Sequence, residues 1–95
     1  MKIKFSKHAQ NKIKERRIRV EDIENVLKNP NSIFYDVDSK AFVSIAEIEV
    51  EEIKINLIVV HKKEGEAVKV ITAYPCKNIE REVKRKEGLI WIRIK

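Results

Sequence analysis

The chain has a single cysteine, Cys76, so it can form no internal disulfide and no zinc site built from cysteines. It has only two glycines and two prolines, and its 43% hydrophobic and 38% charged content is typical of a folded domain. No apolar run approaches the roughly 20 residues of a membrane helix, and the first ten residues lack a signal-peptide core. These absences predict one cytoplasmic domain spanning residues 1–95, with no membrane attachment.

The charge of the chain is unevenly distributed. Residues 1–19 carry eight Lys and Arg against one Glu, residues 20–66 carry five against eleven acidic residues, and residues 67–95 carry eight against three. If the fold brings the two basic ends together, one face of the molecule suits a polyanion. The alternative interpretation is a highly charged surface that only keeps the protein in solution.

Hydrophobic periodicity predicts an α+β fold in which two N-terminal helices cover one face of an antiparallel sheet. After one short strand, the apolar residues recur at helical spacing, and from residue 32 onward they alternate as in strands. Three or four antiparallel strands are therefore expected after the helices. The predicted elements are a strand at residues 2–5, helices at about 7–17 and 20–28, and strands within 32–75 with a hairpin loop at 62–66.

The last twenty residues are predicted to add a helix and a strand to a core of residues 1–75. The stretch KNIEREVKRKEG has two apolar residues at i and i+4, and Gly88 can end a helix. The closing LIWIRIK is too apolar to remain in water on either face. We expect it to bury Trp91 and to pair with the chain's own sheet or, in a homodimer, with that of another subunit.

A row of polar residues along the first helix is the strongest candidate for a site. Ser6 can cap this helix, Ala9 marks its buried side, and His8, Lys12 and Arg16 follow one another at i, i+4 and i+8. Histidine exchanges protons near neutral pH, and cations beside it can hold a phosphate. The competing interpretation is that the row is only the solvated side of the helix.

Three further polar residues come from the predicted strands. His61 is the only other histidine, and it can supply the second proton-transfer group that phosphodiester cleavage without a metal requires. The alternative is that it is only a solvated residue at the end of a strand. Thr72 and Tyr74 share a sheet face and can offer two hydroxyl groups to a phosphate. Strict alternation puts Val68 and Val70 on that face too, so the two hydroxyl residues can equally be the end of a core stripe.

The sequence gives no reason to expect a metal or another cofactor. Glu47, Glu49 and Glu51 share a strand face, but no histidine or aspartate joins them at ligand spacing. They are more simply interpreted as a solvated face. There is also no glycine-rich phosphate loop, and Cys76 has no neighbour in the sequence that would activate it.

The motif FSKHAQNKIKERRI, followed by VEDIENVLKNP and about forty residues later by VITAYP, resembles a known family. It is a widespread bacterial and archaeal family of uncharacterised domains that share a Ser-x-His-Ala helix and a Thr-x-Tyr-Pro-like strand. That family is grouped with the RelE/ParE-like toxins and, more widely, with small metal-independent ribonucleases related to barnase and the colicin tRNA nucleases. The resemblance covers about residues 3–75 and leaves the last twenty residues outside.

The resemblance implies RNA cleavage by attack of a 2′-OH on its neighbouring phosphate, without a metal and with a cyclic phosphate as product. His8 would act as base or acid, and Arg16 would stabilise the charge of the transition state. The implied catalytic residues are His8, Arg16 and Tyr74, and the implied substrate-binding residues are Lys12, Arg17, Thr72 and His61.

Two positions depart from the family pattern. Lys12 stands where the family tends to have arginine, which keeps the charge but loses the bidentate fork. Arg17 stands where a glycine often closes the helix. Either this turn differs from that of the family, or Arg17 adopts a left-handed backbone at a cost of roughly 1 kcal/mol or more.

RNA is the expected partner, together with an antitoxin-like protein, since toxins of this superfamily are typically held inactive by a small partner. The alternative is a non-catalytic module that binds RNA or a protein through the same basic face. A third alternative is a toxin-like fold that acts on something other than RNA. Cleavage requires His8, Arg16 and Tyr74 in one cleft, whereas binding requires only charge.

Overall fold

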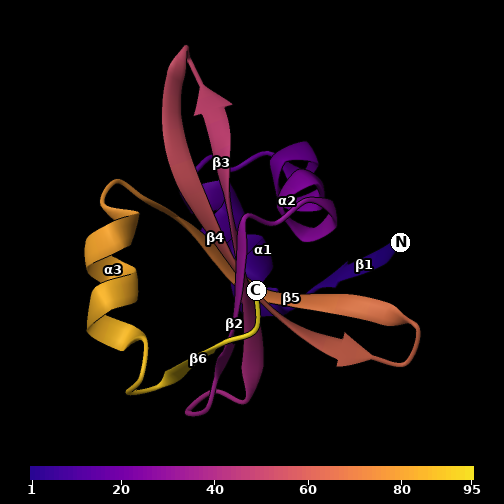
Figure 1. Cartoon of the computed structure of the whole chain (residues 1–95). Helices are drawn as coiled ribbons and strands as arrows, with labels where there is room; N and C mark the ends of the chain where they lie inside the picture. Colours follow the sequence, from indigo (N-terminus) through magenta and orange to yellow (C-terminus); the bar gives the residue numbers. More distant parts are fainter.

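A computed structural model describes all 95 residues and shows three helices and one six-stranded sheet (Figure 1). The predicted α+β class is confirmed, with the two N-terminal helices on one face of the sheet and a C-terminal helix and strand added. In chain order the elements are β1 (Lys2–Phe5), α1 (Lys7–Glu15), α2 (Val20–Lys28), β2 (Ser32–Asp36), β3 (Ala41–Val50), β4 (Ile53–Glu64), β5 (Ala67–Cys76), α3 (Ile79–Lys86) and β6 (Trp91–Arg93). None of the helices is long and apolar enough to cross a membrane.

The strands lie in the order β1-β5-β4-β3-β2-β6. Strands β2 to β5 form the predicted antiparallel meander, and β6 pairs antiparallel with β2. The expectation of a purely antiparallel sheet is wrong at one edge, because β1 runs parallel to β5, with Lys2 opposite Ala67. Parallel strands need a long connection, and the connection from β1 to β5 comprises α1, α2 and the strands β2, β3 and β4.

The first hydrophobic core lies between the sheet and the two N-terminal helices. Ala9 of α1 and Ile23 and Val26 of α2 are fully buried there. They pack on small and branched residues of β3, β4 and β5, namely Ala46, Leu57, Val59, Val70 and Ala73. The helices are only nine residues each, so packing of their apolar stripe rather than intrinsic propensity holds them in place.

The second core lies on the opposite face of the sheet, under α3 and β6. Phe34 and Trp91 stack with ring centroids 5.1 Å apart, and the Trp91 indole N–H donates to the Asp36 carboxylate at 3.2 Å. Trp91 is 1% exposed and lies in a strand of the chain's own sheet, as predicted. Ile92 and Ile94 remain 57% and 54% exposed, so only one face of the last strand is covered.

A β-bulge in β5 changes which residues share a face. Val60 is opposite Thr72 while His61 is opposite Val70, so Ile71 has no cross-strand partner. Val70 therefore packs in the first core, and Tyr74 packs against the second. The expectation that Val70 shares a face with Thr72 and Tyr74 is wrong, because the extra residue reverses the alternation.

The backbone at Arg17 follows one of the two alternatives expected there, and Gly65 also has a positive φ. Gly65 has a φ of 61° in the turn between β4 and β5. Arg17 has a φ of 55°, so it adopts the left-handed backbone at the end of α1, which is two residues shorter than expected. The left-handed residue turns the chain sharply from α1 into α2.

Candidate functional site

Ser6 fixes α1 against β5. Its backbone N–H donates to the Val70 carbonyl at 2.9 Å, and its hydroxyl donates to the Ile71 carbonyl at 3.1 Å. The same hydroxyl oxygen accepts the N–H of Ala9 at 3.0 Å and so caps the helix. Two residues of the Ser-x-His-Ala motif are thus structural, and they leave the intervening His8 exposed on the helix.

Arg16 connects the end of α1 to an open edge of the sheet. Strand β1 pairs with β5 only as far as Val70, so the following part of β5 has no neighbouring strand on that side. The Arg16 Nη1 donates to the Ala73 carbonyl at 2.8 Å and lies 3.5 Å from the Thr72 hydroxyl. Its guanidinium carbon is 5.9 Å from the centre of the Tyr74 ring. Three of the predicted site residues therefore meet at this edge.

Tyr74 points to the face opposite to α1. It packs against the second core, whereas Ala9 of α1 belongs to the first. Burial raises the pKa of the Tyr74 phenol, and the Lys86 ammonium nearby offsets part of that effect. The expectation that His8, Arg16 and Tyr74 share one cleft is wrong, because the sheet separates α1 from Tyr74. Only Arg16 reaches around the edge of the sheet.

His61 is held in a separate environment on β4. Its Nε2 is 2.8 Å from the Ser44 hydroxyl, and its ring stacks on Phe42 with centroids 6.0 Å apart. Burial lowers its pKa from 6.5 to about 4, so the ring is neutral at pH 7. A neutral imidazole cannot act as the acid in phosphodiester cleavage, and nothing in the sequence alone predicted Ser44 as its partner.

The cations of this region differ in whether a carboxylate neutralises them. Lys12 pairs with Glu15 at 3.4 Å, and Arg19 pairs with Asp22 at 3.3 Å. Neither Arg16 nor Arg17 takes part in any of the eight ion pairs of the protein. Both are exposed, so the end of α1 presents two unneutralised guanidinium groups.

A cavity of about 530 Å³ lies next to these arginines and was missed by the sequence analysis. It is lined by Arg16, Arg17 and Arg19 from the connection between the helices, by Lys77, and by apolar residues of β3, β4 and β5. The signal was present in IEVEEIKINL, where apolar residues alternate on both sides of a two-residue turn. His8, Thr72 and Tyr74 do not line it.

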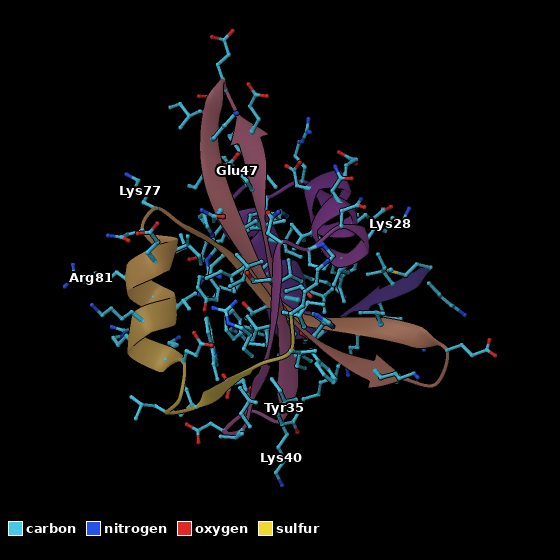
Figure 2. The ribbon with its side chains drawn as sticks, in the orientation of Figure 1. Lys28, Tyr35, Lys40, Glu47, Lys77 and Arg81 are labelled. Atoms are coloured by element: carbon cyan, nitrogen blue, oxygen red, sulfur yellow. The ribbon has the colours of Figure 1, made fainter.

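A second cavity, of about 600 Å³, lies between α2 and the hairpin of β3 and β4 and has an acidic lining that includes Asp22 and Glu47. Figure 2 shows Glu47 on this hairpin and Lys28 at the end of α2. No group of three or more His, Cys, Asp or Glu side chains is arranged to hold a metal ion.

The family comparison covers most of the chain. A family model described as a domain of unknown function, DUF4258, matches residues 5–75. No curated protein and no solved structure matches the chain. Grouping with the RelE/ParE-like toxins therefore stays a prediction. The match runs from the end of β1 to the end of β5 and leaves out α3 and β6. Since the family match covers well over half of the residues of the chain, the chain belongs to the DUF4258 family.

Proposed function

We propose that the protein binds single-stranded RNA along the open edge of β5 and the adjoining flank of α1. The observation that carries this proposal is the state of Arg16. Its guanidinium is anchored by the Ala73 carbonyl, has no carboxylate partner and lies beside an aromatic ring. An anchored cation loses little side-chain entropy when it contacts a phosphate, because its geometry is already fixed.

The surroundings of Arg16 support an extended anionic ligand. Lys12 and His8 precede it along α1, and Arg17 follows it with its charge unneutralised. Residues 1–19 carry eight cations against one acidic residue, which favours a chain of phosphates over a single small anion. RNA is preferred over DNA because of the resemblance to small ribonucleases.

Binding can be tested by fluorescence anisotropy with a labelled single-stranded RNA of mixed sequence. Arg16→Ala is expected to weaken binding by about tenfold or more, since a hydrogen bond between charged groups is lost. The matched control is Arg81→Ala, because Arg81 points away from the sheet on the outer side of α3 (Figure 2) and its loss should change the affinity by less than about twofold. Equal losses for both variants, or no binding by the wild type at low salt, would contradict the proposal.

A second function, cleavage of that RNA, would have to use His8 and Arg16 without Tyr74, because the sheet separates Tyr74 from α1. The observation that favours it is that Arg16 joins the end of α1 to Thr72 at the open edge of β5. His8 would accept the proton of the 2′-OH as the oxygen attacks phosphorus. A cyclic phosphate would form, and the 5′-oxygen would leave and take up a proton from His8 or water. Burial lowers the pKa of His61 to about 4 and raises the pKa of the Tyr74 phenol, so the exposed His8 of α1 is taken as the base.

Cleavage is distinguished from binding by its product. RNA incubated with the protein and a chelator should yield ends that carry a 2′,3′-cyclic phosphate, and DNA of the same sequence should stay intact. His8→Ala should abolish the product while leaving the anisotropy titration nearly unchanged. If the wild type binds RNA but no product appears across varied sequences, the protein is a binding module, and the grouping with RelE/ParE-like toxins concerns the fold alone.

A further inference from the structure

The hairpin of β3 and β4 extends past α2 (Figure 1). It carries apolar side chains that no other element covers. Cross-strand pairing places its apolar residues on the side of the sheet that α1 and α2 cover lower down. We call this surface the hairpin platform; its residues are Ile48, Val50, Ile53, Ile55 and Pro75, and all of them line the 530 Å³ cavity. Val50 is 46% exposed and Ile53 is 67% exposed. Covering this surface would remove apolar area from water.

The two ends of the hairpin platform carry opposite charges that do not pair with each other. Glu51 and Glu52 form the tip of the hairpin, whereas Arg16, Arg17 and Lys77 line the cavity from the connection between α1 and α2 and from the residue after β5. None of these five side chains takes part in an ion pair within the chain. The surface is therefore an apolar strip with an acidic end and a basic end.

The acidic tip goes against local backbone preference. Glu51 and Glu52 have φ values of 49° and 67° in a two-residue hairpin turn, a geometry that favours Asn-Gly. Side chains with a Cβ are strained in this region, and two glutamates gain nothing locally from it. Residues with strained backbone angles concentrate at functional sites. We therefore expect the two carboxylates to interact with a group outside their own turn.

We propose that the hairpin platform is covered by the hairpin platform of a second copy of this chain, in a twofold symmetric dimer. When two copies pack antiparallel, each acidic tip lies over the basic end of the other copy, and the apolar residues face one another. Every contact is then made twice, as a closed twofold interface requires. One hairpin platform can pair with another in this way because the acidic residues of each are complementary in charge to the basic residues of the other.

RNA fits this surface less well. Unpaired RNA bases stack on aromatic side chains or arginine planes, and the apolar part of the platform has no aromatic residue. Phosphates would also meet the carboxylates of Glu51 and Glu52. The dimer would share Arg16 and Arg17 with the proposed RNA site, so the two proposals are tested by different readouts, molar mass for the dimer and anisotropy for RNA binding.

The first test is the molar mass of the full chain by analytical ultracentrifugation from micromolar to submillimolar concentration. Wild type is expected to dimerise, and Ile53→Glu should raise the dimer dissociation constant by about a hundredfold or more, because it buries an unpaired charge. The matched control is Ile92→Glu, since Ile92 is 57% exposed on the edge strand β6. Its dimer should be unchanged.

A charge exchange tests the end-to-end arrangement. Glu51→Lys with Glu52→Lys in one chain, and Arg17→Glu with Lys77→Glu in another, should each give a monomer through like-charge repulsion. An equimolar mixture of the two should recover a heterodimer. Failure of the mixture to associate, with both variants folded by circular dichroism, would overturn the antiparallel arrangement.

A last variant tests whether the strained turn at Glu51 and Glu52 serves the dimer. Glu51→Asn with Glu52→Gly should raise the unfolding midpoint of the dilute, monomeric protein, because it supplies the residues that this turn favours. It should also weaken the dimer at least about tenfold. A wild type that stays monomeric throughout, a dimer lost with Ile92→Glu instead of Ile53→Glu, or a tip variant with an unchanged dimer would each overturn the proposal.

Discussion

Both faces of the sheet carry paired and unpaired cations, such as the Arg19–Asp22 pair on the first face and the unpaired Lys84 of α3 on the second, and they differ in where the unpaired cations lie. On the face of α1 and α2, Arg16 and Arg17 have no carboxylate partner. On the face of α3 and β6, Lys86 pairs with Glu82 at 2.9 Å and Arg93 pairs with Glu87 at 2.7 Å. Unneutralised cations are available to a ligand, whereas paired ones hold the fold together.

The hydrophobic cores on the two faces of the sheet also differ in composition. The first core is aliphatic and lies under helices that the DUF4258 match includes. The second is built around the stacked rings of Phe34 and Trp91, with Lys86 4.9 Å above the Trp91 ring and Arg93 4.7 Å above Phe34. We infer that the C-terminal helix and strand close the second face, whereas the candidate site lies at the open edge of β5, where Arg16 reaches the Ala73 carbonyl.

Replacing Trp91 with alanine should have the largest effect on this comparison. The side chain is 1% exposed, so its loss should lower the free energy of unfolding by about 3–5 kcal/mol. Ile92→Ala on the same strand should cost less than about 1 kcal/mol, because its side chain is 57% exposed. Urea unfolding followed by circular dichroism measures both. Similar losses for the two variants would show that β6 does not close the second core.

Acid should destabilise the protein through His61. Its pKa is about 4 in the folded state and 6.5 when free, so the unfolded chain binds a proton first as the pH falls. Stability should be constant above pH 7 and decrease between about pH 6.5 and pH 4 by up to roughly 3 kcal/mol. Urea midpoints across this range measure the effect. His61→Gln should remove most of the slope, and a slope that persists in that variant would assign it to carboxylates instead.

Arg16 and Arg93 provide a matched pair across the sheet. Each removal should cost stability, since Arg16 caps the Ala73 carbonyl and Arg93 covers Phe34. Only Arg16→Ala should also weaken RNA binding, by about tenfold or 1.4 kcal/mol. Parallel anisotropy titrations measure the difference. If Arg93→Ala weakens RNA binding as much, the ligand recognises net charge and not one face.

Neutralising Glu82 should have the smallest effect. Its hydrogen bond with Lys86 holds the pKa of the carboxyl below its usual range, so the pair contributes stability above that range and loses it as the pH falls. Glu82→Gln should lower the free energy of unfolding by about 0.5–1 kcal/mol, because solvent screens the pair. RNA affinity should not change. A larger loss would mean that α3 depends on this pair and not on its apolar contacts.

Much of the candidate site was predictable because its residues follow local rules. The cap at Ser6, the buried Ala9 and the row of His8, Lys12 and Arg16 all come from helical spacing. The left-handed backbone of Arg17 was also one of two predicted outcomes. What could not be predicted is the separation of Tyr74 from α1, because one bulged residue, Ile71, reverses the alternation beyond it.

The sequence by itself determined the order of the elements, the basic first helix and the burial of Trp91, because periodicity, charge and hydrophobicity act over a few neighbouring residues. Only the tertiary structure decided that β1 runs parallel to β5, that β6 lies beside β2, and that Arg16 reaches the Ala73 carbonyl. These outcomes join residues up to 65 positions apart. Pairing at such range is selected by packing of the whole chain, since many partners satisfy the same local pattern.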